Sequence, residues 1–110
     1  MKQNQKTLLR DFFLGFVRIH ILHHACQEEI FGAGITRELA RHGYRLSPGT
    51  LYPLLHQMEK RGFLSRREQV VSGRLRKYYR CTPAGRKALA RARTQISELV
   101  REVMEEPAKR

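Results

Sequence analysis

The sequence contains no tryptophan, a single aspartate and no long apolar segment, and these shortages exclude several classes of protein. A membrane span needs roughly 18 to 20 consecutive apolar residues, and no such run is present. The first 25 residues also lack the charged start, apolar middle and small-residue cleavage site of a signal peptide. We therefore expect a cytoplasmic protein that has no membrane partner.

Catalytic and metal-binding patterns are equally scarce. Asp11 is the only aspartate, four of the nine glutamates fall within residues 98–106, and no nucleophile-base pair or phosphate-binding loop is visible. The two cysteines, Cys26 and Cys81, stand 55 positions apart, outside the spacings of a disulfide framework or a zinc site. The sequence thus predicts no enzymatic activity, no cofactor, no bound metal and two reduced thiols.

Basic residues are what the sequence has in excess. Its 110 residues include 22 Lys or Arg against 10 Asp or Glu, which gives a formal net charge of +12. Arginine accounts for 16 of the 22, and residues 41–80 alone carry ten basic and two acidic side chains. A chain of this length forms one domain, and arginine suits phosphate oxygens and guanine edges better than lysine does. The charge therefore points to nucleic acid as the partner.

Apolar periodicity predicts four helices and one hairpin. Spacings of three and four residues are typical of helices, whereas short extended runs around Ser72-Gly73 are typical of a hairpin. Ser47-Pro48 and Thr82-Pro83 indicate helix starts, because a hydroxyl oxygen can accept a free backbone N–H and proline fits the first helical position. The predicted elements are helices over about 8–26, 34–42 and 47–61, a hairpin over about 63–81, and a C-terminal helix over 82–106.

The last predicted helix carries an apolar seam with heptad-like spacing. Its members are Leu89, Ala92, Ile96, Leu99 and Val103. A helix of about 25 residues, at 1.5 Å per residue, is longer than a small domain is wide. The seam therefore needs a second surface to bury it.

Three helices followed by a basic hairpin are the order of a winged helix-turn-helix. The expected fold is mainly α with a small β-hairpin, in which residues 1–81 form the DNA-binding domain and residues 82–106 the dimerisation helix. The helix over 47–61 would bury Leu51, Leu54, Leu55 and Met58 and enter the major groove of double-stranded DNA with its opposite face. The residues we expect to contact DNA are Arg45, Ser47, Pro48, Gly49, Thr50, Tyr52, Pro53, Gln57, Lys60, Arg74, Arg76 and Lys77.

Within this set the expected roles differ. Ser47, Gly49 and Thr50 would hold a phosphate at a helix N-terminus, whereas Gln57 would read an adenine edge. Pro53 breaks a local rule, because proline in a helix interior removes a backbone hydrogen bond and clashes with the carbonyl four residues back. A functional strained site and a simple kink both explain that proline.

Two blocks of sequence resemble the PadR family of bacterial and archaeal transcriptional regulators. One is the run Leu46-Ser47-Pro48-Gly49-Thr50-Leu51-Tyr52-Pro53-Leu54-Leu55, continued by Met58-Glu59 and Gly62-Phe63-Leu64. The other comprises Gly73, Arg76, Lys77, Tyr78, Tyr79, Thr82, Gly85 and Leu89, which resemble the wing of that family and the start of its C-terminal helix. The resemblance covers roughly residues 8–105.

Membership of the short PadR subfamily, with one helix after the wing, would imply a homodimeric winged-helix regulator. The resemblance implies that the first and last helices form the dimer contact, where we place Phe12 and Phe16. It also implies repression from a pseudo-palindromic operator, with the identity of any small-molecule effector left open. One departure is that Ala33-Gly34-Ile35 stands where many members carry His-Gly-Tyr, so no effector or packing role is carried over to those positions.

Two alternative functions stay open. His20, His24 and Glu28 fall at i, i+4 and i+8 of the first helix, with His23 and Cys26 nearby, a pattern also typical of a metal- or redox-responsive winged-helix sensor. We favour the interpretation that His20 packs in the apolar stripe while the others are solvated. The second alternative is a basic protein that binds nucleic acid without sequence preference.

Overall fold

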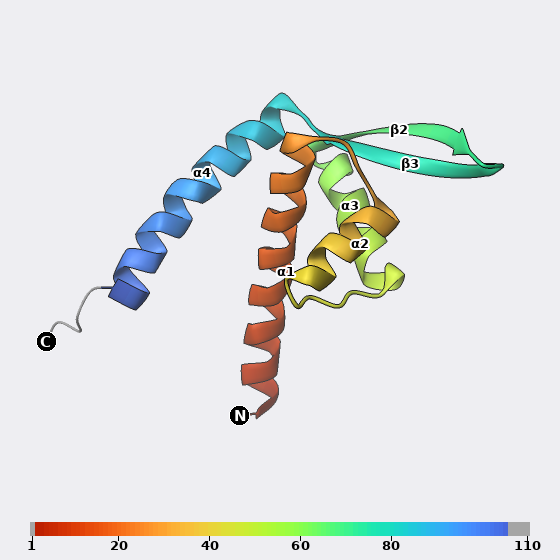
Figure 1. The fold of residues 1–110 in the computed structure, drawn as a ribbon. Coiled ribbons are helices and arrows are strands. Elements are labelled where there is room, and N and C mark those ends of the chain that lie inside the picture. The colour runs from red at the N-terminus through yellow and green to blue at the C-terminus, as the bar shows by residue number, and fades with distance from the viewer. Residues whose placement is uncertain (1, 106–110) are drawn as a thin grey trace, which may run out of the picture.

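The computed structural model describes residues 2–105, and its mainly helical winged-helix architecture is the predicted one (Figure 1). The predicted end of the last helix at Glu106 lies outside these residues. A π-helical segment, η1, continues α4. The elements are α1 (Lys2–Gln27), β1 (Ile30–Phe31), α2 (Gly32–Arg41), α3 (Pro48–Lys60), β2 (Leu64–Val71), β3 (Arg74–Cys81), α4 (Pro83–Val100) and η1 (Arg101–Glu105).

The start of the molecule differs from the prediction in three ways. Helix α1 begins at Lys2 instead of near residue 8. The prediction started late because residues 4–7 are polar and exposed and show no apolar periodicity. Helix α2 begins at Gly32 instead of near residue 34. Ile30 and Phe31 form the short strand β1, which two residues of sequence give too little pattern to predict.

Local signals end α2 and α3 in the same way. In α3 the amide of Gly62 donates to the Glu59 carbonyl and that of Phe63 to the Met58 carbonyl, both at 2.9 Å. Gly62 has φ +88°, the left-handed conformation that this Schellman motif requires. Helix α2 ends likewise at Gly43, also with φ +88°, and the Tyr44 amide donates to the Leu39 carbonyl at 2.9 Å.

The two predicted helix starts behave differently. The Thr82 hydroxyl oxygen accepts the Gly85 amide at 3.0 Å, as predicted for α4. Ser47 makes no such bond to the α3 backbone, and its hydroxyl instead donates to Thr50 Oγ1 at 3.3 Å. The expected serine cap is therefore wrong in its bonding, although Ser47 does occupy the N-cap position.

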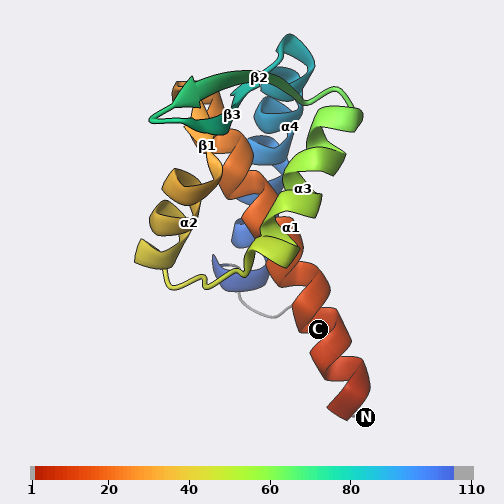
Figure 2. The same cartoon turned by 90° about the vertical axis from the view of Figure 1, so that its right-hand side faces the viewer.

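The sheet has the antiparallel order β1-β3-β2. Val71 pairs with Arg74, and Ser72 and Gly73 between them have φ 52° and 78°, as a two-residue hairpin turn with two left-handed positions needs. The wing thus has the predicted turn, and β1 adds a third strand along β3. Figure 2 shows the sheet across the C-terminal end of α1, with α2 and α3 below it.

One apolar core joins α1, α2, α3, the sheet and the first turns of α4. It includes the predicted inner face of α3, which is confirmed. Its buried side chains are Val17, Ile21, Leu22, Ala25, Ile30, Ile35, Leu39, Leu51, Leu54, Leu55, Met58, Leu64, Tyr79, Cys81 and Leu89. Because no charged or polar side chain is buried among the described residues, the exposed face of α3 rests on an entirely apolar support.

The prediction of two free thiols is wrong. Cys26 and Cys81 form a disulfide with their Cα atoms 4.8 Å apart. The reason is topological, because the last residue of β3 lies against the last turn of α1 although 55 positions separate the two residues. Sequence spacing carries no information about a contact that the sheet creates.

Helices α1 and α4 project from this core. They contact each other near the end of α1 and the start of α4 and then diverge (Figure 1). The Cα radius of gyration is 16.2 Å, with extents of 62 × 33 × 25 Å, whereas a compact domain of this length has about 13 Å.

No helix within residues 2–105 is long and apolar enough to span a membrane.

Candidate nucleic-acid interface

The outward face of α3 is the first component of the candidate site. Tyr52, Pro53, Gln57 and Lys60 are exposed on the side opposite the buried leucines. Pro53 lies inside the helix, which continues through it to Lys60. Packing of the inner face therefore holds a row of polar and ring side chains toward solvent.

The N-terminus of α3 is open. Ser47, Pro48 and Gly49 are exposed, and Thr50 is half-buried. A Cβ added at Gly49 would meet only Ser47 Oγ at 3.7 Å, an ordinary contact. The packing of this chain therefore does not require glycine there, whereas a ligand that approaches the backbone closely would.

The wing and α3 share a cavity of about 600 Å³. Tyr52 lies on one side, with its hydroxyl so close to Gly32 that a Cβ there would be 2.1 Å from the oxygen. The full lining comprises Phe31, Gly32, Ala33, Tyr52, Val71, Ser72, Arg74, Leu75, Arg76 and Lys77. Four of the predicted DNA-contacting residues, from α3 and β3, therefore line one hollow, while Arg45 lies exposed in the loop before α3.

Carboxylates neutralise several of the wing arginines. Arg67 bonds Glu29 through two nitrogens at 2.7 Å, and Arg80 Nη2 lies 4.0 Å from the same carboxylate. Arg66 Nε lies 3.3 Å from Glu59 Oε1 of α3, and a second nitrogen of Arg66 bonds Glu68. These pairs arise from the tertiary fold, so the sequence alone did not separate neutralised from free arginines.

The remaining wing cations have no acidic partner within residues 2–105. The Arg76 guanidinium stacks 4.3 Å above the Phe31 ring. Arg74 and Lys77 are exposed near the tip, and no carboxylate of the described chain lies within 4.0 Å of either. Of the wing residues predicted to contact DNA, these three keep their charge unneutralised.

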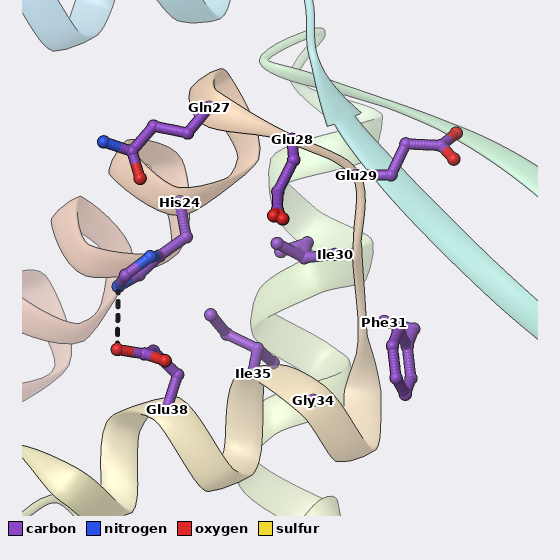
Figure 3. Close-up of a pocket in the computed structure, with 9 residues that line it drawn as sticks. All are labelled: His24, Gln27, Glu28, Glu29, Ile30, Phe31, Gly34, Ile35 and Glu38. Atoms are coloured by element: carbon purple, nitrogen blue, oxygen red, sulfur yellow. Dashed lines mark ion pairs between the residues drawn. The ribbon is translucent and has the colours of Figure 1, made fainter.

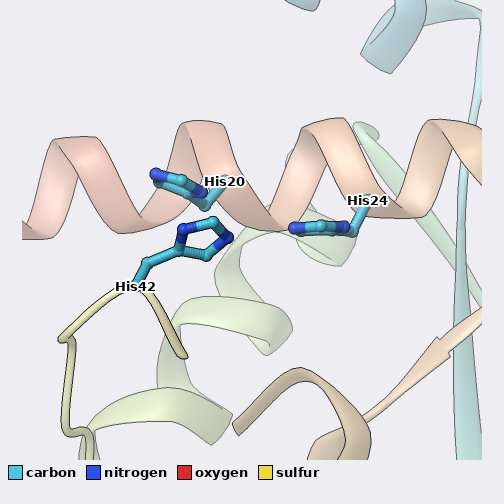
Figure 4. Close-up of side chains that lie close together, drawn as sticks. All are labelled: His20, His24 and His42. Atoms are coloured by element: carbon cyan, nitrogen blue, oxygen red, sulfur yellow. The ribbon is translucent and has the colours of Figure 1, made fainter. Parts of the chain in front are cut away.

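A second cluster lies on the other side of the loop that precedes α3. The ligand nitrogens of His20, His24 and His42 lie within 4.8 Å of one another, and Figure 4 shows the His42 ring directed toward those on α1. Glu28, the predicted companion of His20 and His24, is not in this group. Sequence reasoning missed His42 because the Schellman turn after α2, and not helical spacing, brings it there.

Burial disfavours the protonated forms of His20 and His24. Burial lowers the pKa of His20, and the neighbouring His42, His24 and His23 lower it further. Burial also lowers the pKa of His24, which Glu38 raises and His23 lowers to smaller degrees. The pKa of Glu38 is lowered chiefly by its hydrogen bond from Arg41, so its carboxylate is charged beside the histidines.

A pocket of about 420 Å³ adjoins the histidines between the end of α1 and α2 (Figure 3). His24 and Glu38 form one wall, with His24 Nε2 4.0 Å from Glu38 Oε2. Glu28, Glu29 and Phe31 lie toward the sheet. The histidine cluster is thus open to solvent on this side.

Exposed apolar side chains mark a third surface. Phe12 is 62% and Phe16 39% exposed on α1, and Ile96 on α4 is 43% and Val103 on η1 64% exposed. Ala92 is half-buried and Leu99 exposed. Leu89 differs from the other predicted dimer residues, because it packs in the core of its own chain with 4% exposure and is unavailable to a partner.

Comparison with known proteins identifies the family. Residues 21–91 match the model of the transcriptional regulator PadR-like family. Over 96 residues the chain is 55% identical to transcriptional regulator Rv3488 of Mycobacterium tuberculosis, covering 87% of this chain and 90% of that protein.

Solved structures agree with this assignment. A PadR-like transcription factor from Bacteroides fragilis superposes with a TM-score of 0.78 at 28% identity, over 91% of this chain and 95% of the other. A PadR family regulator from Eggerthella lenta superposes with a TM-score of 0.76 at 25% identity, over 96% of both chains. With an open recognition helix, a basic wing and these matches, the chain belongs to the PadR-like family of DNA-binding transcriptional regulators.

Proposed function

We propose that the protein is a cytoplasmic homodimer that represses transcription by binding a pseudo-palindromic operator through α3 and the wing. The observation that carries this proposal is the shared hollow of α3 and the wing, where Tyr52, Arg74, Arg76 and Lys77 meet. A duplex that enters this hollow is contacted by a recognition helix and by unneutralised cations together. The alternative of binding without sequence preference predicts no discrimination between duplexes.

The residue roles follow from position. Ser47, Gly49 and Thr50 at the open start of α3 hold a phosphate, since amides and the positive end of a helix favour an anion. Gln57, one exposed turn after Pro53, reads a base edge in the major groove. Arg45, Pro48 and Lys60 flank this face, and Arg74, Arg76 and Lys77 contact the neighbouring backbone.

The exposed apolar stripes of α1 and α4 support a second copy as the dimer partner. Phe12 and Phe16 on α1, and Ala92, Ile96, Leu99 and Val103 on α4, would form the contact. An isologous interface pairs the same surfaces of both copies, so two exposed stripes on one chain can bury each other in pairs. Two α3 helices related by that axis would meet half-sites about one DNA turn, roughly 34 Å, apart.

Fluorescence anisotropy with the duplex upstream of the coding region tests this proposal, at about 150 mM salt with excess unrelated DNA. We expect binding that survives the competitor with two chains per site. Gln57→Ala should weaken operator binding by about 1–3 kcal/mol and reduce selectivity at one base pair. Arg93→Ala, on exposed α4, is the control and should leave the binding intact.

Binding that disappears into the competitor for both variants and the parent would contradict a specific operator at that site. Repression is tested separately by transcription from the same promoter in vitro. Added protein should lower the transcript level, and an increase would show activation instead.

A further inference from the structure

We propose that His20, His24, His42 and Glu38 form a binding site for a divalent transition metal of the zinc class, and that this metal is the effector of the regulator. The effector part rests on the proposed function, whereas the metal site does not. The sequence alone favoured a packed His20 with the other histidines solvated, and the fold changes that interpretation because it adds Glu38 of α2 and the C-cap residue His42.

The donor set is the first argument. The nitrogens of the three histidines lie within 4.8 Å of one another, and two ligands on one tetrahedral zinc are separated by roughly 3.4 Å. A bound metal would therefore draw these nitrogens closer together. Imidazole is the most common metal ligand in proteins and suits zinc, copper and nickel.

Glu38 supplies the fourth donor. Its Oε2 lies 3.6 Å from His42 Nε2 and 4.0 Å from His24 Nε2, so this oxygen faces two of the three imidazoles. Arg41 Nη2 now lies 2.5 Å from the other oxygen, Oε1. The Oε2 oxygen is thus available to a metal while the arginine keeps the carboxylate oriented, the role an outer partner plays in metal sites.

Rigid elements position these ligands. His20 and His24 are one turn apart on α1, whose inner face packs Val17 and Ile21 in the core. His42 is the C-cap residue of α2, and its amide donates to the Leu39 carbonyl at 3.0 Å. The pocket at His24 and Glu38 provides a path from solvent (Figure 3).

Ring packing explains the place of His20, whose ring centroid lies 4.9 Å from that of Phe16 and 5.4 Å from that of Tyr44, but it does not explain why His24 and His42 approach it. The rings of His20 and His42 lie 5.1 Å apart and that of His24 lies 6.5 Å from His42, at a half-exposed edge of the molecule. Three imidazoles beside one carboxylate repel one another when protonated, whereas one shared cation would satisfy all four groups. The arrangement therefore fits a bound metal better than a structural contact.

The location suggests how a metal would act on DNA binding. His42 lies in the loop five positions before Ser47, the N-cap of α3, and the other two histidines are on α1. A metal would therefore link α1 to the loop that orients the recognition helix. A metal acts as an effector if it binds one position of this loop more tightly than another. Such coupling commonly changes the affinity for the second ligand, here DNA, by about 5- to 150-fold.

The test uses the full chain without a tag, stripped of metal, with Co²⁺ as a spectroscopic probe and Zn²⁺ as competitor. We expect the intense visible bands of four-coordinate Co²⁺, which Zn²⁺ abolishes at one equivalent per chain. His42→Gln should raise the Zn²⁺ dissociation constant by more than about 100-fold, since a lost ligand costs more than a lost outer partner. His56→Gln, on the exposed face of α3, is the matched control and should not change it.

Equal effects of His42→Gln and His56→Gln, or no binding by the parent protein, would overturn the site. His42 is exposed, and unchanged circular dichroism of the variant excludes unfolding as the cause. Operator affinity is then measured with and without one equivalent of Zn²⁺, and we expect at least a 5-fold change.

An unchanged operator affinity with a filled site would overturn the effector role alone. Absence of operator binding in both states would contradict the proposed function and leave the metal site standing.

Discussion

Arg67 on the wing donates two hydrogen bonds to Glu29, one from Nε and one from Nη2, each 2.7 Å long. Glu29 lies 38 positions earlier, between α1 and β1. The same guanidinium lies 4.4 Å above the Tyr78 ring of β3. This pair attaches the base of the wing to the end of α1 and removes one wing arginine from the charge offered to DNA.

The Glu29 and Arg67 pair makes stability depend on pH in acid. The hydrogen bond from Arg67 is the main cause that lowers the pKa of Glu29 below its ordinary 4.5, and the charges of Arg67 and Arg80 add to it. A carboxyl with a lowered pKa in the folded state stabilises fully above its unfolded pKa, and this contribution disappears as pH falls through the folded value. Glu29→Gln should therefore be less stable than the parent at pH 7.

The measurement is the urea midpoint of both proteins between about pH 7 and pH 3. We expect the difference between the two urea midpoints to shrink only below about pH 4.5. Glu98→Gln on exposed α4 serves as control and should track the parent throughout. A gap between Glu29→Gln and the parent that is constant with pH would show that the charge of Glu29 is not responsible.

Gly85 should tolerate no side chain. A Cβ at this position in the first turn of α4 would lie 2.3 Å from the Phe63 carbonyl oxygen and 2.9 Å from Cys81 Sγ. A backbone carbonyl cannot rotate away, so Gly85→Ala should lower the free energy of unfolding by about 1–3 kcal/mol or more, the typical cost of overpacking.

Gly15→Ala is the matched control, because nothing lies within 4 Å of its added Cβ. Alanine in the middle of α1 should stabilise the helix by roughly 0.5–1 kcal/mol. Chemical denaturation of the two variants distinguishes them by sign. Stabilisation of both variants would show that backbone entropy, and not the contact with Phe63, governs the effect at Gly85.

The sequence predicted what local chemistry determines. Ser72-Gly73 specified the hairpin turn, Gly62 ended α3, and the spacing of Leu51 to Met58 identified its buried face. Several unpredicted features join distant segments: β1 on β3, the cysteine pair, Glu29 on Arg67, and His42 beside His20. Each depends on which elements pack together, and residue spacing does not record that.

The disulfide between Cys26 and Cys81 should contribute strongly to stability in the oxidised protein. It closes a loop of 55 residues, for which chain entropy gives about 4 kcal/mol. The double variant Cys26→Ser and Cys81→Ser should therefore unfold at lower urea concentration than the oxidised parent. Thiol titration under denaturing conditions should find free thiols only after reduction.

Reduced parent protein is the control for that variant. Its urea midpoint should coincide with that of the double variant, since both lack the same crosslink. If the reductant leaves the parent midpoint unchanged, the crosslink does not stabilise the fold.

A charge placed in the α4 stripe should separate the dimer. Leu99 is 53% exposed in the single chain, and burying an unpaired carboxylate against a partner is costly. Leu99→Glu should lower the mass found by sedimentation equilibrium from twice the chain mass of 12.9 kDa to the chain mass itself.

Val70→Glu places the same charge on an apolar side chain that is 66% exposed on the wing. It should leave the mass unchanged, because the proposed dimer contact does not include the wing. A parent protein that sediments with the mass of one chain would contradict the dimer directly.

Salt dependence should distinguish the free wing cations from the neutralised ones. Each phosphate contact contributes about 0.9 to the slope of log affinity against log salt. Arg74 and Lys77 have no carboxylate partner in the described chain, so Arg74→Ala should reduce the slope by about 1.8 in a dimer that uses two copies. Arg67→Ala should change it much less, because Glu29 already neutralises Arg67.

Anisotropy titrations of the parent and both variants between about 50 and 200 mM salt measure these slopes. With about 6 to 10 contacts, the affinity of the parent should fall by roughly 10³ to 10⁵ over this range. A larger reduction of the salt slope for Arg67→Ala than for Arg74→Ala would mean that DNA displaces Glu29 from the wing. The Glu29 and Arg67 pair would then open on binding, and the end of α1 would become part of the response to DNA.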